Sequence, residues 1–197
     1  MVTLEKTKAL IERAYTCACV HGFHDEEKSV EHWMMLALSE VGEIVEADRK
    51  GRGRCDLGSI LDDAMRTKDL TWSFKEYVKD SVEDEMADVC IRLYDLCGIK
   101  GIEPVVFYED KYVKAMRDTF KELMGDKSLC ERCYSLSAIL CRAENGNIRE
   151  DELPSIIGAA LCFVWCMAED MGIDLLRHIE LKMSYNESRE KRHGKSY

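Results

Sequence analysis

The sequence has few of the features that mark disordered, secreted or membrane-spanning chains. Only 2 of its 197 residues are proline, and its 46% hydrophobic and 34% charged residues are typical of a globular protein. No apolar run approaches the roughly 20 residues that span a bilayer. The N-terminal stretch MVTLEKTKALIERAY also lacks the continuous apolar segment of a signal peptide. We therefore expect a cytoplasmic location and no membrane partner.

The chain also has fewer positively charged than negatively charged residues. The chain has 28 Lys and Arg residues against 38 Asp and Glu residues, which gives a formal net charge of −10. Such a protein repels polyanions, so no nucleic-acid partner is expected. It can still bind phosphate groups where metal ions mediate the contact.

Sustained alternation of apolar and polar residues is absent, whereas the 3.6-residue period of helices dominates. The predicted fold class is therefore all-α. Ser29 is a plausible N-cap, Ser81 and Asp84 fit a capping box, and residues 51–80 are expected to form a long irregular segment with one short helix. The expected main helices run over about residues 4–20, from Ser29 to the stretch RKGRG, from Ser81 to Cys97, and over about residues 103–123.

The ten cysteines do not indicate a disulfide framework. Several lie in apolar helical stretches and are interpreted as small core residues: Cys90, Cys97, Cys141, Cys162 and Cys166. Two clusters stand apart, the stretch CACVHGFH with Cys17, Cys19, His21 and His24, and the pair Cys130 and Cys133. No second CxxC or HxxxH stands at zinc-finger spacing, so core and surface roles are favoured over a structural zinc site.

Two predicted helices carry acids where the pattern predicts apolar packing residues. Glu40 and Glu43 interrupt the apolar face of the second helix. Glu85 lies on the apolar stripe of the third helix, and Asp88 follows one turn later. Like charges at this distance repel, and burying them unpaired is costly. A divalent cation would remove both costs, although a single E-x-x-E pair usually faces solvent.

Four carboxylates from two packed helices would form an oxygen-rich site suited to Mg²⁺, with Mn²⁺ as the alternative. We predict Glu40, Glu43, Glu85 and Asp88 as both metal ligands and catalytic residues. A di-iron four-helix protein is disfavoured because its sites use Glu-x-x-His pairs. No histidine stands three residues after Glu43 or Glu85.

The C-terminal stretch LKMSYNESREKRHGKSY is basic although the chain is acidic. Lys182, Asn186 and Arg189 follow one another at i, i+4 and i+7, which places them on one face of a helix. Such a set can bind phosphate oxygens, with lysine as a point charge and arginine as a fork. The alternative is a frayed, solvated helix end.

The chain contains signs of an internal duplication. LALSEVGEIVEADRKG resembles SLSAILCRAENG, and ADVCIRLYDLCGIKGIE resembles GAALCFVWCMAEDMGID. We predict one globular domain made of a repeat over 1–126, which carries the acids, and a degenerate repeat over 127–197, which carries the basic segment. Chance similarity of amphipathic helices is the alternative. The four acids correspond to apolar or small residues of the second repeat, Ala138, Cys141, Ile156 and Ala159.

The stretches GFHDEEKSVEHWMMLALSEVGEIVEADRKG, EDEMADVCIRLYDLCGIKGI and LKMSYNESREKRHGK together resemble the MazG-like branch of the all-α NTP pyrophosphatases. The resemblance implies a helical bundle of that type, which hydrolyses a nucleoside triphosphate to the monophosphate and pyrophosphate. It implies that Mg²⁺ is held by the four acids and that Lys182, Asn186 and Arg189 contact the phosphates. For Asp95 it implies a contact with the sugar or with a metal-bound water, and an ion pair is the alternative.

The middle of the chain departs from this family pattern, because residues 103–172 intervene before the basic segment. We interpret the chain as two fused copies, with Lys111 matching Lys182, so that one composite site forms across a pseudo-dimer interface. The expected assembly is a monomer of this kind or a homodimer. Two other functions stay open, a non-catalytic nucleotide sensor and a related hydrolase acting on dUTP or phosphoribosyl-ATP. The aromatic candidates for contacting the base, with core packing as the competing role, are Trp33, Trp72, Phe74 and Tyr77.

Overall fold

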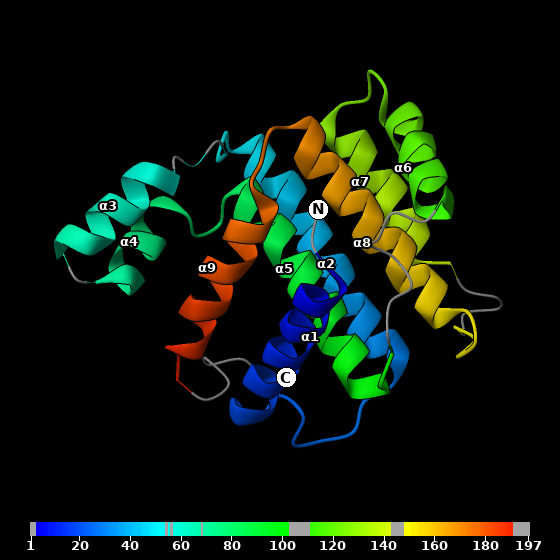
Figure 1. The fold of residues 1–197 in the computed structure, drawn as a ribbon, viewed down its shortest axis with the longest axis horizontal. Coiled ribbons are helices and arrows are strands. Elements are labelled where there is room, and N and C mark those ends of the chain that lie inside the picture. Colours follow the sequence, from blue (N-terminus) through cyan, green and yellow to red (C-terminus); the bar gives the residue numbers. More distant parts are fainter. Residues whose placement is uncertain are drawn as a thin grey trace.

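The computed structural model describes residues 3–53, 55, 57–67, 69–102, 111–142 and 148–190. Every regular element in these ranges is a helix, which confirms the all-α prediction (Figure 1). The helices are α1 (Leu4–Val20), α2 (Val30–Arg49), α3 (Leu57–Thr67), α4 (Leu70–Tyr77), α5 (Val82–Lys100), α6 (Lys111–Met124), α7 (Leu129–Leu140), α8 (Leu153–Asp170) and α9 (Leu175–Glu187).

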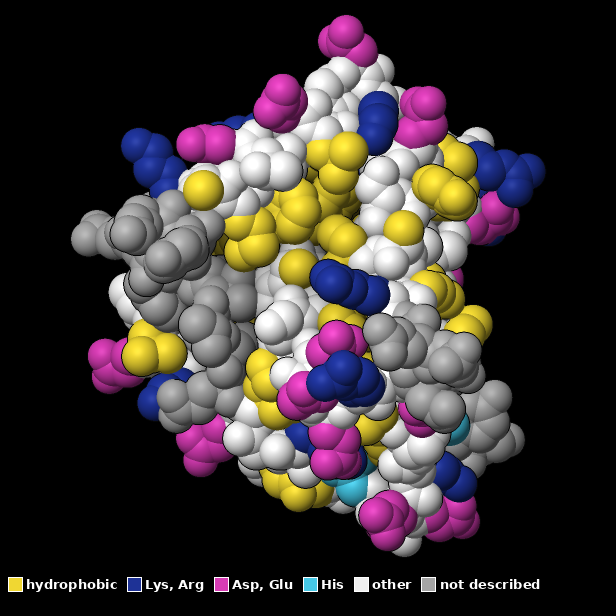
Figure 2. All heavy atoms as spheres, turned by 90° about the vertical axis from the view of Figure 1, so that its right-hand side faces the viewer, with side chains coloured by type: hydrophobic (Ala, Val, Ile, Leu, Met, Phe, Trp, Pro, Cys, Tyr) yellow, Lys and Arg dark blue, Asp and Glu magenta, His cyan; other side chains and the backbone are white. Residues whose placement is uncertain are grey.

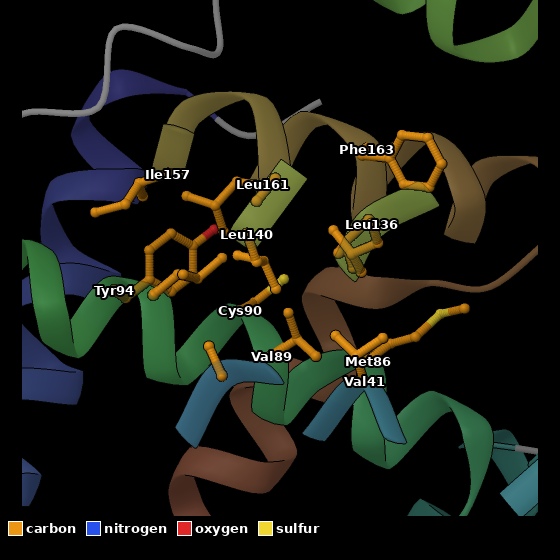
Figure 3. Close-up of a cluster of buried hydrophobic side chains, with 14 of the residues drawn as sticks. Val41, Met86, Val89, Cys90, Tyr94, Leu136, Leu140, Ile157, Leu161 and Phe163 are labelled. Carbon is orange, nitrogen blue, oxygen red and sulfur yellow. The ribbon is translucent and has the colours of Figure 1, made fainter. Parts of the chain in front are cut away.

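The core lies between two helix pairs. The α2 and α5 helices pack along each other, α7 packs on α2 and α8, and α8 also contacts α5. Figure 3 shows side chains from all four helices meeting in this core, including Val41 of α2, Tyr94 of α5, Leu136 of α7 and Leu161 of α8. Buried residues lie on one face of α2 and of α7 but around most of α5 and α8, so these apolar surfaces are buried only when the four helices pack together.

Three further helices flank this core. The α1 and α9 helices both pack on α5 and contact each other, while α6 packs on α8. The α3 and α4 helices form a hairpin that projects from the bundle in Figure 1 and contacts α9 through α4. Phe74 of α4 stacks on Tyr185 of α9 with ring centroids 4.4 Å apart. This stack belongs to a small second core that holds the hairpin in place.

The predicted caps are largely confirmed. Ser29 accepts a hydrogen bond from the His32 amide, and Ser81 accepts one from the Asp84 amide. The predicted capping box at Ser81 is only half formed, because the Asp84 carboxylate accepts from the Asp80 amide instead. That contact keeps Asp84 turned inward from the first turn of α5.

Several sequence expectations need correction. The segment 51–80 holds two helices, α3 and α4, where one short helix was expected. The third predicted helix does not end before Gly98 but continues to Lys100 and stops at Gly101, which adopts a positive φ of 62°. Of the fourth predicted helix, residues 103–110 lie outside the described residues, and α6 forms the remainder.

The cysteine predictions are mostly confirmed. Cys90, Cys97, Cys162 and Cys166 are buried free thiols, as expected of core residues. Cys141 is exposed because it caps the C-terminus of α7 rather than lying within a packed face.

The surface mixes both signs of charge. Figure 2 shows Lys and Arg side chains next to Asp and Glu side chains over the face that it presents, with one group of hydrophobic side chains in its upper middle and others scattered over it. The α8 helix is the one described helix that is long and apolar enough to cross a membrane by length and composition. Because 67% of it is buried inside the fold, its apolar composition serves the core of the bundle here.

Candidate metal and phosphate site

Three of the four predicted metal ligands converge between two helices. Glu40 and Glu43 project from α2 and Glu85 from α5, and ligand oxygens of the three lie within 4.8 Å of one another. Glu40 and Glu85 are buried, with 4% and 3% exposure, whereas Glu43 is exposed. The cluster therefore has two interior ligands and one that opens to solvent.

Burial controls the charge of this cluster. Burial, followed by the charges of Asp88 and Asp84, raises the pKa of Glu85 to about 9. Oε2 of Glu85 is buried with no hydrogen-bond partner among the described residues. Burial and Asp88 also raise the pKa of Glu40, which Arg92 opposes. A divalent cation among these oxygens would favour their ionised forms and satisfy the buried Oε2, so the residues fit such an ion.

Arg92, which was not among the predicted site residues, also lies in this cluster. Its Nε donates to Oε1 of Glu40 at 2.9 Å. Although burial opposes the charge of Arg92, Glu40 and Asp88 raise its pKa, so the guanidinium stays positive. A recognisable signal was present, because Arg92 follows Asp88 by one helical turn and thus shares the acidic face of α5.

The fourth predicted ligand, Asp88, is held by the C-terminal helix. Nζ of Lys182 lies 2.8 Å from Oδ2 of Asp88 and 2.8 Å from Oδ1 of Asp84. Burial opposes the charge of Lys182, but Asp88 and Asp84 raise its pKa, so the ammonium stays protonated. Burial raises the pKa of Asp84 to about 6 against the opposing effect of Lys182. Asp84 is a second residue of this cluster that was not among the predicted site residues.

One small pocket collects most of the remaining predicted residues. The pocket has a volume of ≈ 90 Å³ and lies between α1, α5 and α9. Five of the eight predicted site residues line it, namely Asp88, Asp95, Lys182, Asn186 and Arg189. Asp88 thus lines the pocket and also raises the pKa of Glu40 and the pKa of Glu85.

Arg189, which follows the C-terminal end of α9, connects this end to the turn after α1. The carbonyl oxygen of Arg189 accepts a hydrogen bond from Nε2 of His21 at 2.9 Å, and the Arg189 guanidinium lies 5.5 Å from the centroid of the Tyr185 ring. Residues 191–197, which complete the basic C-terminal stretch, and the side chain of Lys111 lie outside the described residues. The predicted phosphate-contacting face is therefore described only from Lys182 to Arg189.

Asp95 pairs with His24, which fits the ion-pair alternative, although the sequence did not indicate this partner. It is 6% exposed, and His24 Nε2 lies 3.1 Å from each of its carboxylate oxygens. Burial raises the pKa of Asp95, and the hydrogen bond from His24 opposes that change. Among the aromatic candidates, Trp33 and Phe74 are buried core residues, whereas Trp72 and Tyr77 are exposed on α4.

Comparison with known proteins identifies no relative. No protein-family model matches the chain, and neither a curated protein nor a solved structure matches it.

Proposed function

We propose that this protein is a Mg²⁺-dependent nucleoside triphosphate pyrophosphohydrolase that converts a (d)NTP to the (d)NMP and pyrophosphate. The observation that carries the proposal is the position of Asp88. The charge of this carboxylate raises the pKa of Glu40 and the pKa of Glu85. The same carboxylate pairs with Lys182 and lines the pocket beside Asn186 and Arg189. An acidic cluster suited to a cation thus adjoins basic and amide groups suited to phosphate oxygens.

The metal would be held by Glu40, Glu43 and Glu85, with Asp88 as the fourth ligand once Lys182 shares its charge with phosphate. Carboxylate oxygens are the ligands that Mg²⁺ prefers, with Mn²⁺ as the alternative. A bound divalent cation supplies Lewis acidity at the phosphate chain.

The chain's own residues would provide the rest of the chemistry. We assign Lys182 and Arg189 to offsetting the negative charge that builds on the departing pyrophosphate, with Asn186 as a neutral hydrogen-bonding neighbour. A glutamate of the cluster serves as the base for the attacking water. Arg92 holds Glu40 in position, since its Nε donates to that carboxylate at 2.9 Å.

The proposal includes a fused, two-copy origin of the fold. In support, the α2 and α5 pair packs against the α7 and α8 pair, and the closing helices are exchanged. The α9 helix, which ends the second copy, packs on α5, and α6, which ends the first copy, packs on α8. This exchange is how the acids of one copy meet Lys182 of the other at 2.8 Å.

Turnover tests the function directly. The purified full-length chain is incubated with Mg²⁺ and each (d)NTP, and pyrophosphate and monophosphate are measured. Replacing Glu43, the exposed ligand, with Gln should lower turnover by at least about 100-fold, since it removes a charged ligand without opening a cavity.

Glu46→Gln is the matched control for Glu43→Gln. Glu46 lies one turn further along α2, is exposed and pairs with Arg49 and Lys50, so its loss should leave turnover unchanged. Nucleotide binding without pyrophosphate release would instead identify a sensor, and hydrolysis of dUTP or phosphoribosyl-ATP alone would identify the related hydrolase.

A further inference from the structure

A second group of side chains that could act as nucleophile, base and acid lies at the C-terminal end of α1. Cys19 is exposed on the last turn of α1, His24 follows in the next turn, and Asp95 is buried on α5. Sγ of Cys19 lies 3.2 Å from Nδ1 of His24. Nε2 of His24 lies 3.1 Å from both carboxylate oxygens of Asp95. A thiol, an imidazole and a carboxylate thus form a continuous line from the solvent to the interior.

The carboxylate determines which nitrogen of His24 carries the proton. An ionised carboxylate can only accept hydrogen bonds, so Nε2 must donate to Asp95. In the neutral ring this leaves Nδ1 as an acceptor, and Nδ1 is the nitrogen that faces Cys19. The imidazole is therefore set to take the thiol proton, as in other arrangements of nucleophile, base and orienting acid.

Two aromatic rings fix the plane of this imidazole. The ring of Tyr15 lies 5.1 Å from that of His24 at 34°, and the ring of Trp33 lies 5.3 Å away at 82°. The His24 side chain is only 14% exposed. Because packing and the Asp95 contact both restrain the ring, the distance to Cys19 does not depend on a freely rotating side chain.

Because Cys19 lies at the C-terminal end of α1, it depends on the His24 imidazole to form a thiolate. A helix C-terminus carries partial negative charge, which disfavours a thiolate. An exposed cysteine there should react slowly unless a neighbouring cation stabilises the ionised form. Once His24 has taken the thiol proton, its imidazolium, paired with Asp95, supplies that cation.

We propose that Cys19 is the nucleophile of a Cys19, His24 and Asp95 relay and a site of thiol–disulfide exchange with small-molecule disulfides. The Cys19 proton passes to Nδ1 of His24, and the thiolate attacks one sulfur of the disulfide. The disulfide bond of the small molecule breaks as the new bond to Cys19 forms. The departing thiolate takes the proton from His24 and leaves as a thiol, so Cys19 is oxidised and half of the small disulfide is reduced. The reaction needs neither a metal nor a triphosphate and is independent of the proposed function.

Cys141 provides an internal reference for the test. It is also exposed and also caps the C-terminus of a helix, α7, but no histidine contact to it is found among the described residues. Cys130 is a poorer reference because it lies in the first turn of α7, where the helix dipole favours a thiolate. Buried Cys90 and Cys97 report on unfolding, since only an opened protein exposes them.

The experiment measures the modification rate of each cysteine in the full-length chain. The protein is pulsed at pH 7 with the neutral disulfide 2,2′-dithiodipyridine, quenched in acid and digested, and each cysteine is quantified by mass spectrometry. In the wild-type chain Cys19 should react at least about tenfold faster than Cys141, because an unaided thiol is ionised to only a few per cent at this pH. Equal rates would overturn the proposal.

Two variants separate the relay from simple exposure. His24→Gln should bring Cys19 down to the rate of Cys141 or below it, and an unchanged Cys19 rate would overturn the proposal. Asp95→Asn keeps the shape of the side chain but lets the amide donate to Nε2, which favours the wrong tautomer. It should therefore slow Cys19 while Cys141 and the buried cysteines keep their wild-type rates, and a Cys19 rate equal to wild type would contradict the role of Asp95.

Discussion

The buried acids of this protein differ in whether a cation neutralises them. Arg92 pairs with Glu40, and Lys182 pairs with Asp84 and Asp88. Glu85 is 3% exposed and has no ion-pair partner among the described residues. Glu85 therefore stays protonated at neutral pH, since burial penalises its charged form. Glu85 is therefore the residue that should respond most strongly to an added cation.

In the absence of divalent cations, the free energy of unfolding should fall as the pH rises through neutrality. The pKa of Glu85 is raised from 4.5 to about 9 in the folded protein. Between these values the folded state holds a proton that the unfolded state has released, so stability is greatest below the lower value and is lost towards the higher one. Urea unfolding at several pH values in EDTA measures this loss.

Glu85→Gln and Mg²⁺ provide the controls for the pH effect. The amide cannot ionise, so the free energy of unfolding of the variant should not show the part of the decrease with pH that Glu85 causes. Adding Mg²⁺ should stabilise the wild-type chain more than the variant at pH 8, because only the wild-type chain offers this carboxylate to the ion. Identical pH profiles for the two proteins would show that Glu85 does not titrate in this range.

At the scale of the helix, the close approach of α1 to α5 depends on a glycine inside a helix. A Cβ at Gly98 would lie 2.5 Å from Cβ of Tyr15. Tyr15 Cβ is attached to the α1 backbone and cannot move away as a flexible side-chain end could. The sequence predicts a helix end before Gly98, whereas in the structure α5 continues through this glycine, which lets α1 and α5 pack closely.

Gly98→Ala should therefore destabilise the fold by about 1–3 kcal/mol, the usual cost of overpacking, despite the better helix propensity of alanine. Gly42→Ala in α2 is the matched control, because beyond the adjacent backbone of α2 a Cβ at this position would meet no atom within 4 Å. This control should stabilise the protein by up to about 1 kcal/mol. Urea unfolding midpoints give both values, and a stabilised Gly98→Ala variant would contradict the close packing.

At the scale of the whole molecule, one buried ion pair joins the end of the described chain to its centre. Lys182 and Asp84 are 98 residues apart in sequence, with exposures of 7% and 1%. Lys182→Met should cost about 3–5 kcal/mol at pH 7, because it leaves buried carboxylates without their cation. The loss should shrink as the pH is lowered towards about 4, where protonated carboxyls need no cation.

Lys6→Met is the control for the effect of Lys182→Met. Lys6 pairs with Glu180 and also joins α9 to the rest of the fold, but both side chains are about 40% exposed. Its loss should change the free energy of unfolding by less than about 1 kcal/mol, as for other surface pairs. Equal effects of the two substitutions in chemical denaturation would show that Lys182 is no more important than a surface lysine.

The sequence by itself determined the all-α class and the main helices, and it singled out the acids of α2 and α5 as candidates. Helical periodicity and the caps at Ser29 and Ser81 predicted the main helices, since these signals are local. The acids stood out because they interrupt an apolar stripe, which is visible without coordinates. The hairpin of α3 and α4 was not predicted in full, because such short helices gain most of their stability from contacts such as the Phe74 and Tyr185 stack.

Only the tertiary structure decided which charges meet. Sequence spacing gave no reason to pair Lys182 with Asp84, Arg92 with Glu40 or His24 with Asp95. These contacts follow from how α9, α5 and the turn after α1 pack, and packing brings together residues that are far apart in the chain. The neighbouring helices likewise bury Glu85 and leave Glu43 exposed. The charge state of each carboxyl follows from these surroundings rather than from its own helix.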